Sequence, residues 1–250
     1  MKVGVQLHAQ HTTWPEYRMA WLRADALGVD SIWTWDHLLP VSGEQHGANF
    51  EGWTLLAALA AETRHAFVGP LVACMSFRNP RLLSLMAKTL DHVLGGRLVL
   101  GLGGGWHQAE YDEFGYAFGT PGERLRELER GIECIKERWQ VDQPRPIHGT
   151  VPILVGGSGE RVTLRIAAAH ADIWSGFGPV AEWQRKADVL DDWCRKLGRD
   201  PSHIARAVSV NREDFDDADE FVRAGAMHLI YRCAAPFDLA PVEELLDWRN

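Results

Sequence analysis

The chain has 250 residues, of which 46% are hydrophobic and 24% charged, and its formal net charge is −8 at pH 7. This composition is ordinary for a globular protein, and the length allows a sizeable buried core. The acidic balance and the lack of a Lys/Arg block exclude nucleic acid as an expected partner.

The cysteines and the apolar segments argue against several other classes. The four cysteines stand far apart and form no CxxC pair, which argues against a zinc or disulfide framework. No run of 18 apolar residues occurs, and the first residues, MKVGVQLHAQ, lack the apolar core of a signal peptide. We therefore expect a cytoplasmic protein without a membrane partner. The eleven tryptophans fit core and oligomer packing or an aromatic-lined pocket.

Short apolar strands alternate with amphipathic helices along the whole chain. The predicted strands cover 2–7, 31–36, 66–74, 97–103, 152–156, 171–176, 205–210 and 227–232. The predicted helices cover 15–27, 53–63, 80–93, 121–139, 160–169, 181–197, 216–224 and 239–248. Eight such pairs are typical of a (β/α)8 TIM barrel, an α/β fold, so we expect a single domain over residues 1–250. A doubly wound sheet, which usually has fewer strands, is the alternative.

The fourth predicted strand ends in a glycine cluster, GLGGGW at 101–106. A dinucleotide-binding loop needs GxGxxG after the first strand, but here Trp106 stands in place of the last glycine. The spacing and the position therefore exclude that loop. The glycines let a flat ring or a phosphate approach the backbone, or they merely fit the rim of a barrel.

In a TIM barrel the chemistry lies at the C-terminal ends of the strands. WTWDHLLP (33–40) places Asp36 beside His37 at the end of the second strand. A neutral imidazole can move a proton near pH 7 and a carboxylate can orient it, whereas a surface pair that caps the next segment is the alternative. We also expect a substrate pocket for an apolar or aromatic ligand, lined by residues at strand ends: His8, Trp35, Trp106 and Trp174.

A second glycine-rich segment, ILVGGSGE (153–160), leads from the fifth strand into a helix. Backbone N–H groups at such a helix start attract phosphate, so Gly156, Gly157, Ser158 and Gly159 are candidate ligand contacts. A tight turn with Ser158 as N-cap is the alternative. His8, His11 and the Asp36–His37 pair could bind a metal, but no later strand end completes a ligand set, so we expect none.

Five stretches, in this order, resemble the luciferase-like monooxygenase superfamily and, within it, the coenzyme F420-dependent oxidoreductases. They are ADALGVDSIWTWDHLLP (24–40), FRNPRLLSLMAKTLDHVLGGRLVLGLGGGWHQAEYDEFG (77–115), GERLRELERGIECIKERW (122–139), PILVGGSGERVTLRIAAAHADIW (152–174) and CRKLGRDPSHI (194–204). The resemblance implies an oxidoreductase that uses F420 for hydride transfer to or from a small organic substrate. The alternatives are an FMN-dependent two-component monooxygenase with a separate reductase, and a non-catalytic flavin-binding barrel. A homodimer is expected.

The resemblance also implies roles for particular residues. His37 would be the proton donor or acceptor and Asp36 would touch the cofactor. A non-prolyl cis peptide near Leu71–Val72 would back the cofactor ring, with Cys74 beside it. Two glycine segments would hold the rest of the cofactor: Gly103, Gly104 and Gly105 at the ring or side chain, and Gly156, Gly157, Ser158 and Gly159 at the phosphate-bearing tail.

The sequence departs from the resemblance in two ways. Trp106 stands where some deazaflavin dehydrogenases carry a catalytic Glu just after the fourth-strand glycines. The segment between Trp139 and Pro152, and the stretch after Val210, are shorter than is usual in the group. These shortened insertions predict a more open active site, and the missing acid argues against sugar-phosphate dehydrogenase activity.

Overall fold

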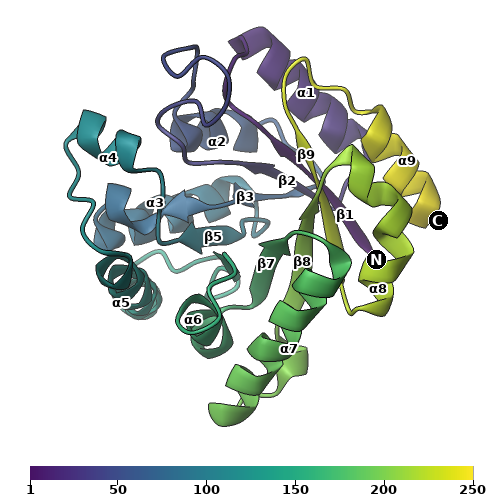
Figure 1. Ribbon diagram of the computed structural model, residues 1–250. Coiled ribbons are helices and arrows are strands. Elements are labelled where there is room, and N and C mark those ends of the chain that lie inside the picture. Colours follow the sequence, from purple (N-terminus) through teal and green to yellow (C-terminus); the bar gives the residue numbers. More distant parts are fainter. Residues whose placement is uncertain (250) are drawn as a thin grey trace.

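Parallel strands form one sheet in the computed structural model of the protein, which describes residues 1–249. Helices surround these strands (Figure 1). The strands are β1 (Lys2–Leu7), β2 (Ser31–Thr34), β3 (Phe67–Pro70), β4 (Ala73–Cys74), β5 (Leu100–Gly103), β6 (Ile153–Gly156), β7 (Ile173–Phe177), β8 (Ala205–Val210) and β9 (His228–Cys233). The helices are α1 (Trp14–Leu27), α2 (Gly52–Ala60), α3 (Pro80–Val93), α4 (Gln108–Phe114), α5 (Pro121–Val141), α6 (Thr163–His170), α7 (Val180–Lys196), α8 (Ala218–Arg223) and α9 (Ala240–Arg249).

The third predicted strand, 66–74, is present as two halves, β3 and β4. A cis peptide between Leu71 and Val72 lies between the halves, at the place that the resemblance implies. The order of the sheet is β3-β2-β1-β9-β8-β7-β6-β5-β4. The N–H of Val68 donates to the carbonyl of Arg97, and the N–H of Val99 donates to the carbonyl of Val68, each at 2.9 Å. These bonds close the ring, so the predicted (β/α)8 barrel is confirmed.

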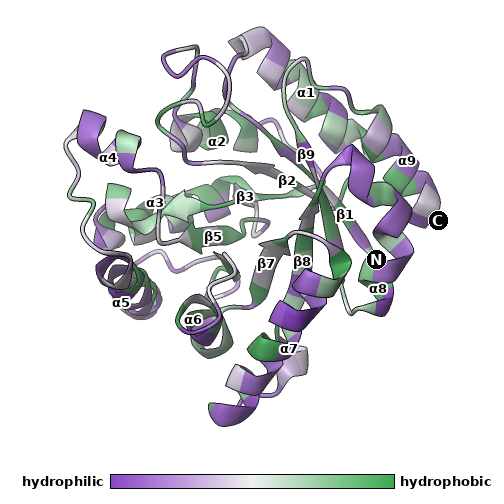
Figure 2. Cartoon of the chain, in the orientation of Figure 1, coloured by the Kyte–Doolittle hydropathy of each residue, from purple (hydrophilic) through white to green (hydrophobic). Residues whose placement is uncertain are grey.

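Side chains alternate between the two faces of each strand, and this alternation produces two layers of hydrophobic core. Val3, Val5 and Leu7 of β1 pack in the large cluster between strands and helices. The opposite faces of the strands fill the barrel with a second, smaller cluster, which comprises Trp33, Leu71, Val99, Leu154, Ala207 and Ile230. Figure 2 shows apolar residues along the central strands and many polar residues on α5 and α7. Since successive side chains of a strand point to opposite faces, this division also determines which strand-end residues reach the mouth.

Several element boundaries differ from those predicted. Helix α6 begins at Thr163, three residues later than predicted, and the predicted helix 216–224 is α8 preceded by a 3₁₀ helix over Arg212–Asp217. Helix α4 was not predicted, because its seven residues are too few for a clear apolar period. No helix within residues 1–249 is long and apolar enough to cross a membrane.

His228 gives the barrel a dependence on pH. Its ring is buried inside the barrel, 2.9 Å from the Ser31 hydroxyl, and burial, with a smaller effect of Lys2, lowers the pKa of His228 to about 3. The unfolded chain takes up a proton near pH 6.5, whereas the folded chain does not. The free energy of unfolding should therefore fall between pH 6.5 and 3, by about 1.4 kcal/mol per pH unit from this group. Denaturant unfolding at several pH values should show a shallower fall for His228→Gln, and no such change for the exposed control His203→Gln.

Candidate active site

Two adjoining cavities lie at the mouth of the barrel, where the strands end. The larger has a volume of about 500 Å³ and the smaller about 170 Å³. They share lining residues from the ends of the second to fourth barrel strands: His37, Leu71, Val72, Gly103, Gly105 and Trp106. The larger volume lies in the range of small-molecule sites.

An aromatic wall runs along the larger cavity. Its residues alternate with outward-facing ones at the ends of β1 and β2, because strand side chains point to opposite faces in turn. The ring of His8 stacks on Trp35, with centroids 4.1 Å apart and planes 17° apart. His37 meets Trp35 edge-on at 5.2 Å and Trp106 at 5.6 Å. Trp106 is 64% exposed, so it forms the rim of the mouth.

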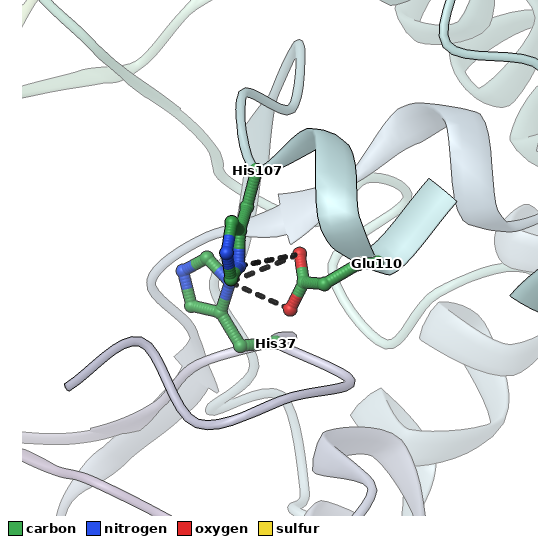
Figure 3. A group of neighbouring side chains, drawn as sticks. All are labelled: His37, His107 and Glu110. Carbon is green, nitrogen blue, oxygen red and sulfur yellow. Dashed lines mark hydrogen bonds and ion pairs between the residues drawn. The ribbon is translucent and has the colours of Figure 1, made fainter. Parts of the chain in front are cut away.

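His37 is held by a buried carboxylate that the sequence analysis did not single out. Glu110, from the first turn of α4, is only 2% exposed, and its two oxygens lie 3.0 and 3.2 Å from Nδ1 of His37 (Figure 3). Its Oε1 also accepts from the backbone N–H groups of Leu38 and Leu39, at 2.7 and 3.2 Å. With Nδ1 occupied in this way, Nε2 is the nitrogen of His37 that remains for a ligand in the cavity.

The charge state of Glu110 follows from these contacts. Burial opposes its ionisation, but the hydrogen bonds from His37, Leu39 and Leu38 outweigh burial and lower the pKa of Glu110 below its usual value. Glu110 is therefore an anion at neutral pH. An anionic carboxylate that accepts a hydrogen bond from Nδ1–H fixes the tautomer and the orientation of the His37 ring.

One group of side chains within residues 1–249 has the spacing of a metal site. The ligand atoms of His37, His107 and Glu110 lie within 4.8 Å of one another (Figure 3). Two imidazoles and a carboxylate could bind a divalent ion. The hydrogen bonds from His37, Leu38 and Leu39 also stabilise the buried negative charge of Glu110, so this charge does not require a metal ion.

Asp36 lies next to His37 in the sequence, but it does not line the larger cavity and contacts Arg78 and Cys74 instead. Its carboxylate accepts two hydrogen bonds from the Arg78 guanidinium, at 2.5 and 2.8 Å, and one from the N–H of Cys74 at 3.0 Å. Burial raises the pKa of Asp36 to about 6, against the lowering effect of Arg78. Asp36 borders the smaller cavity, but its oxygens bind the chain itself. The geometry therefore favours an anchor for the third strand over a proton-transfer group.

Cys74 also borders the smaller cavity, beside the cis peptide. Its Sγ lies 3.1 Å from the hydroxyl of Tyr111, and burial raises the pKa of the thiol. A buried thiol in this state is a weak nucleophile. The position of Cys74 beside the cis peptide is compatible with the role that the resemblance implies, packing beside the cofactor ring.

The glycines of the mouth make room for the chain itself. A Cβ on Gly103 would lie 2.6 Å from Val72 Cγ2, and one on Gly156 would lie 2.7 Å from Val72 Cγ1. Gly105 has a φ of +73°, and a Cβ there would lie 2.0 Å from the hydroxyl of Tyr111. These glycines line the larger cavity, together with Gly104 and Gly157. Because these glycines have no side chains, Val72 and Tyr111 can pack close to their backbone. Val72 also forms part of the wall of the larger cavity.

One expectation about the mouth, Trp174, and one alternative, Ser158 as an N-cap, are wrong. Trp174 is fully buried, stacks on Trp183 at 5.5 Å and donates to the carbonyl of Gly157. It faces the helices because its strand neighbour Ser175 faces the cavity. Ser158 is not an N-cap, since α6 begins at Thr163 after Val162.

Gly156 and Gly157 line the larger cavity, and Ser158 and Gly159 follow them in the chain. The hydroxyl of Ser158 is buried and has no hydrogen-bond partner within residues 1–249. A buried hydroxyl without a partner is unusual in a folded protein. The segment 156–159 therefore remains a candidate for binding a polar part of a ligand.

Comparison with known proteins agrees with the barrel. A relative from Microbacterium testaceum described as F420-dependent glucose-6-phosphate dehydrogenase is 29% identical over 217 residues, covering 78% of this chain and 63% of the relative. Pyrimidine monooxygenase RutA of Variovorax paradoxus is 28% identical over 269 residues, covering 91% of this chain and 72% of the relative. The solved structure of an F420-dependent secondary alcohol dehydrogenase with an F420-acetone adduct superposes with a TM-score of 0.85 at 15% identity, covering 97% of each chain.

The chain is shorter than the F420-dependent curated relatives that it matches. It spans 63% of the Microbacterium protein and 64% of a putative coenzyme F420-dependent oxidoreductase from Mycobacterium tuberculosis, which is less than two thirds of each. The model of the family described as luciferase-like monooxygenase matches residues 1–238, which is most of the chain. The protein therefore belongs to the luciferase-like monooxygenase family.

Proposed function

We propose that the protein is an oxidoreductase that binds coenzyme F420 in the larger cavity and exchanges a hydride with a small organic substrate. The observation that carries this proposal is His37 in the cavity wall, with Nδ1 held by buried Glu110. A histidine oriented in this way can give or take one proton at Nε2 while the hydride moves. Relatives named for F420-dependent activity support the choice of cofactor.

The residues of the mouth fit a deazaflavin or flavin. Leu71 and Val72 would back the ring, and Gly103, Gly104 and Gly105 would flank it, because these residues line the larger cavity. The segment 156–159 would hold the phosphate-bearing tail, which would give the buried Ser158 hydroxyl a partner. The bound cofactor supplies the hydride chemistry, and the protein supplies position and proton transfer.

Other residues of the site would position rather than react. Asp36 would hold Arg78 and the N–H of Cys74, and so fix the segment that follows the cis peptide. Trp35 and Trp106 would offer aromatic faces to a substrate at the mouth. Sugar-phosphate dehydrogenase activity is not part of the proposal, because Trp106 replaces the acid that the resemblance would require.

FMN is the second candidate cofactor, which would make the protein a two-component monooxygenase supplied by a separate reductase. The match to a pyrimidine monooxygenase favours this alternative. Titrating the purified protein with F420 and with FMN, followed by fluorescence, tests both. Binding of F420 supports the main proposal, binding of FMN alone supports the monooxygenase, and binding of neither overturns both. A protein that binds cofactor but turns over no substrate with it would be the non-catalytic barrel.

We further propose that the enzyme is a homodimer and acts in the cytoplasm. Support for the dimer comes from an apolar groove on α2 and α3, where Leu82, Leu85 and Val93 are about half exposed. Such a face is typical of a protein–protein contact. Light scattering of the purified protein tests the dimer, and a mass of one chain would contradict it.

A further inference from the structure

The larger cavity is lined by basic and neutral groups. Among its lining residues within 1–249 are Arg232, His8 and His37, but no Asp and no Glu. The chain as a whole carries a formal charge of −8. The larger cavity therefore carries the positive charge of Arg232 with no carboxylate among its own lining residues, while Asp36 and Glu110 line the smaller cavity beside it, and a positive charge without a counter-ion attracts anions.

Arg232 points into the barrel because of its place on β9. Ile230, two residues earlier, belongs to the cluster that fills the barrel interior, and strand side chains alternate between faces. Arg232 pairs in register with Gln6 of β1, which also lines the cavity. Arg232 therefore lies in the wall of the larger cavity, beside β1.

The charge of Arg232 has no protein partner. Its Nε is buried without a hydrogen bond, and within residues 1–249 the side chain makes no ion pair or hydrogen bond at all. Every other arginine in this part of the chain that is not exposed has a carboxylate or carbonyl partner: Arg18, Arg78, Arg97, Arg124, Arg138, Arg165, Arg199, Arg206 and Arg249. A partly buried guanidinium without a partner is costly, so an anion from a ligand would stabilise it.

A second unpartnered group lies near Arg232. The Nε2 of His8 is buried without a hydrogen bond, and the ring stacks on Trp35 in the wall that leads to His37. Burial lowers the pKa of His8 to about 4, and the charges of Arg232 and His37 make smaller contributions in the same direction. His8 is therefore neutral at pH 7, and Nε2 can donate or accept a single hydrogen bond without adding charge.

We propose that Arg232 binds an anionic oxygen group of the substrate, so that the substrate is a small organic acid or ester of an oxyacid rather than a neutral molecule. The proposal rests on the proposed function and names its substrate class. Arg232 lies on β9, and His8 and His37 follow β1 and β2, so the three residues come from neighbouring strands. An anion on Arg232 would therefore place the rest of a small substrate along the aromatic wall, beside His37. The phosphate of the cofactor is the other source of such an anion.

Anion binding can be tested without cofactor, using inorganic phosphate and sulfate as probes in isothermal titration. Arg232→Gln should weaken binding of both at least tenfold, which is about 1.4 kcal/mol. Arg232→Lys should restore part of the affinity, and the exposed control Arg223→Gln should bind like the wild type. Equal binding by Arg232→Gln and wild type, or no binding by the wild type, would overturn the assignment.

A second arm separates the two sources of the anion. FMN and riboflavin differ by one phosphate, and F420 can likewise be compared with its phosphate-free deazaflavin core. If the site serves the substrate, Arg232→Gln leaves both affinities in each pair unchanged and raises KM for an anionic substrate tenfold or more. A loss confined to the phosphorylated member would assign Arg232 to the cofactor and overturn the substrate class. A protein that binds phosphate through Arg232 but neither F420 nor FMN would keep the anion site and refute the proposed function.

Discussion

Replacing His37 by glutamine should lower kcat by about 10²- to 10⁴-fold and leave the affinity for F420 or FMN nearly unchanged. His37 lines both cavities, and its Nδ1 is committed to Glu110. A glutamine amide can keep a hydrogen bond to Glu110 but cannot exchange a proton at neutral pH. Steady-state kinetics and cofactor titration of the same preparations measure the two effects separately.

The control for this experiment is His46→Gln. His46 lies on the same loop as His37 but is exposed, with its Nδ1 4.0 Å from Glu113 of α4. It should retain wild-type kcat. A His37→Gln enzyme with wild-type kcat would show that another group moves the proton. Equal losses of turnover and cofactor affinity would show that the ring only packs.

The alternation of strands and helices was enough to predict the barrel, because it depends on apolar patterns repeated along the whole chain. The broken third strand was not visible in that pattern. AFVGPLVAC is continuously apolar, and a run of this kind does not show where pairing moves from β2 to β5. The break at Leu71–Val72 came from the family resemblance, and the structure has the cis peptide there.

Some residues of the candidate site were predicted correctly and others were not. The alternation of side chains between the two faces of a strand explains most of these outcomes. Residue type and position at a strand end suggested both Asp36 and Trp174, but neither lines the larger cavity, and Asp36 borders only the smaller one. Ser175 of β7 faces the larger cavity, so its neighbour Trp174 faces the helices, and Asp36 stands between Trp35 and His37, which both line the larger cavity. Arg232 was missed although its inward position follows from the same rule, since Ile230 and Arg232 share a face of β9.

Glu110 could not be found from strand ends, because it lies on a helix. It sits three residues after His107, in a seven-residue helix within a run of acids that suggests a solvated surface. Only the packing of α4 against the loop after β2 brings its carboxylate to His37. Although Trp106 stands where the resemblance implies an acid, the chain has another carboxylate, that of Glu110, beside the glycine cluster.

Replacing Glu110 by glutamine should lower kcat by about 10- to 100-fold with little change in cofactor affinity. The amide oxygen can still accept from Leu38 and Leu39, but the anion that holds Nδ1–H of His37 is lost. ¹⁵N–¹H correlation spectra should show one Nδ1–H tautomer of His37 in the wild type and a mixture in the variant. Glu110→Ala should also be less stable, by about 1–3 kcal/mol for each buried donor left unpaired.

The pH dependence of stability gives an independent measure of the same carboxylate. The folded chain lowers the pKa of Glu110, so its ionised form stabilises the fold above the unfolded value of about 4.5. The difference in unfolding free energy between wild type and Glu110→Gln should be complete at neutral pH and should shrink as the pH falls below that value. Glu113→Gln, on the exposed side of the same helix, is the matched control. If Glu110→Gln keeps both wild-type kcat and a single His37 tautomer, Glu110 holds the loop after β2 in place without orienting the proton-transfer group.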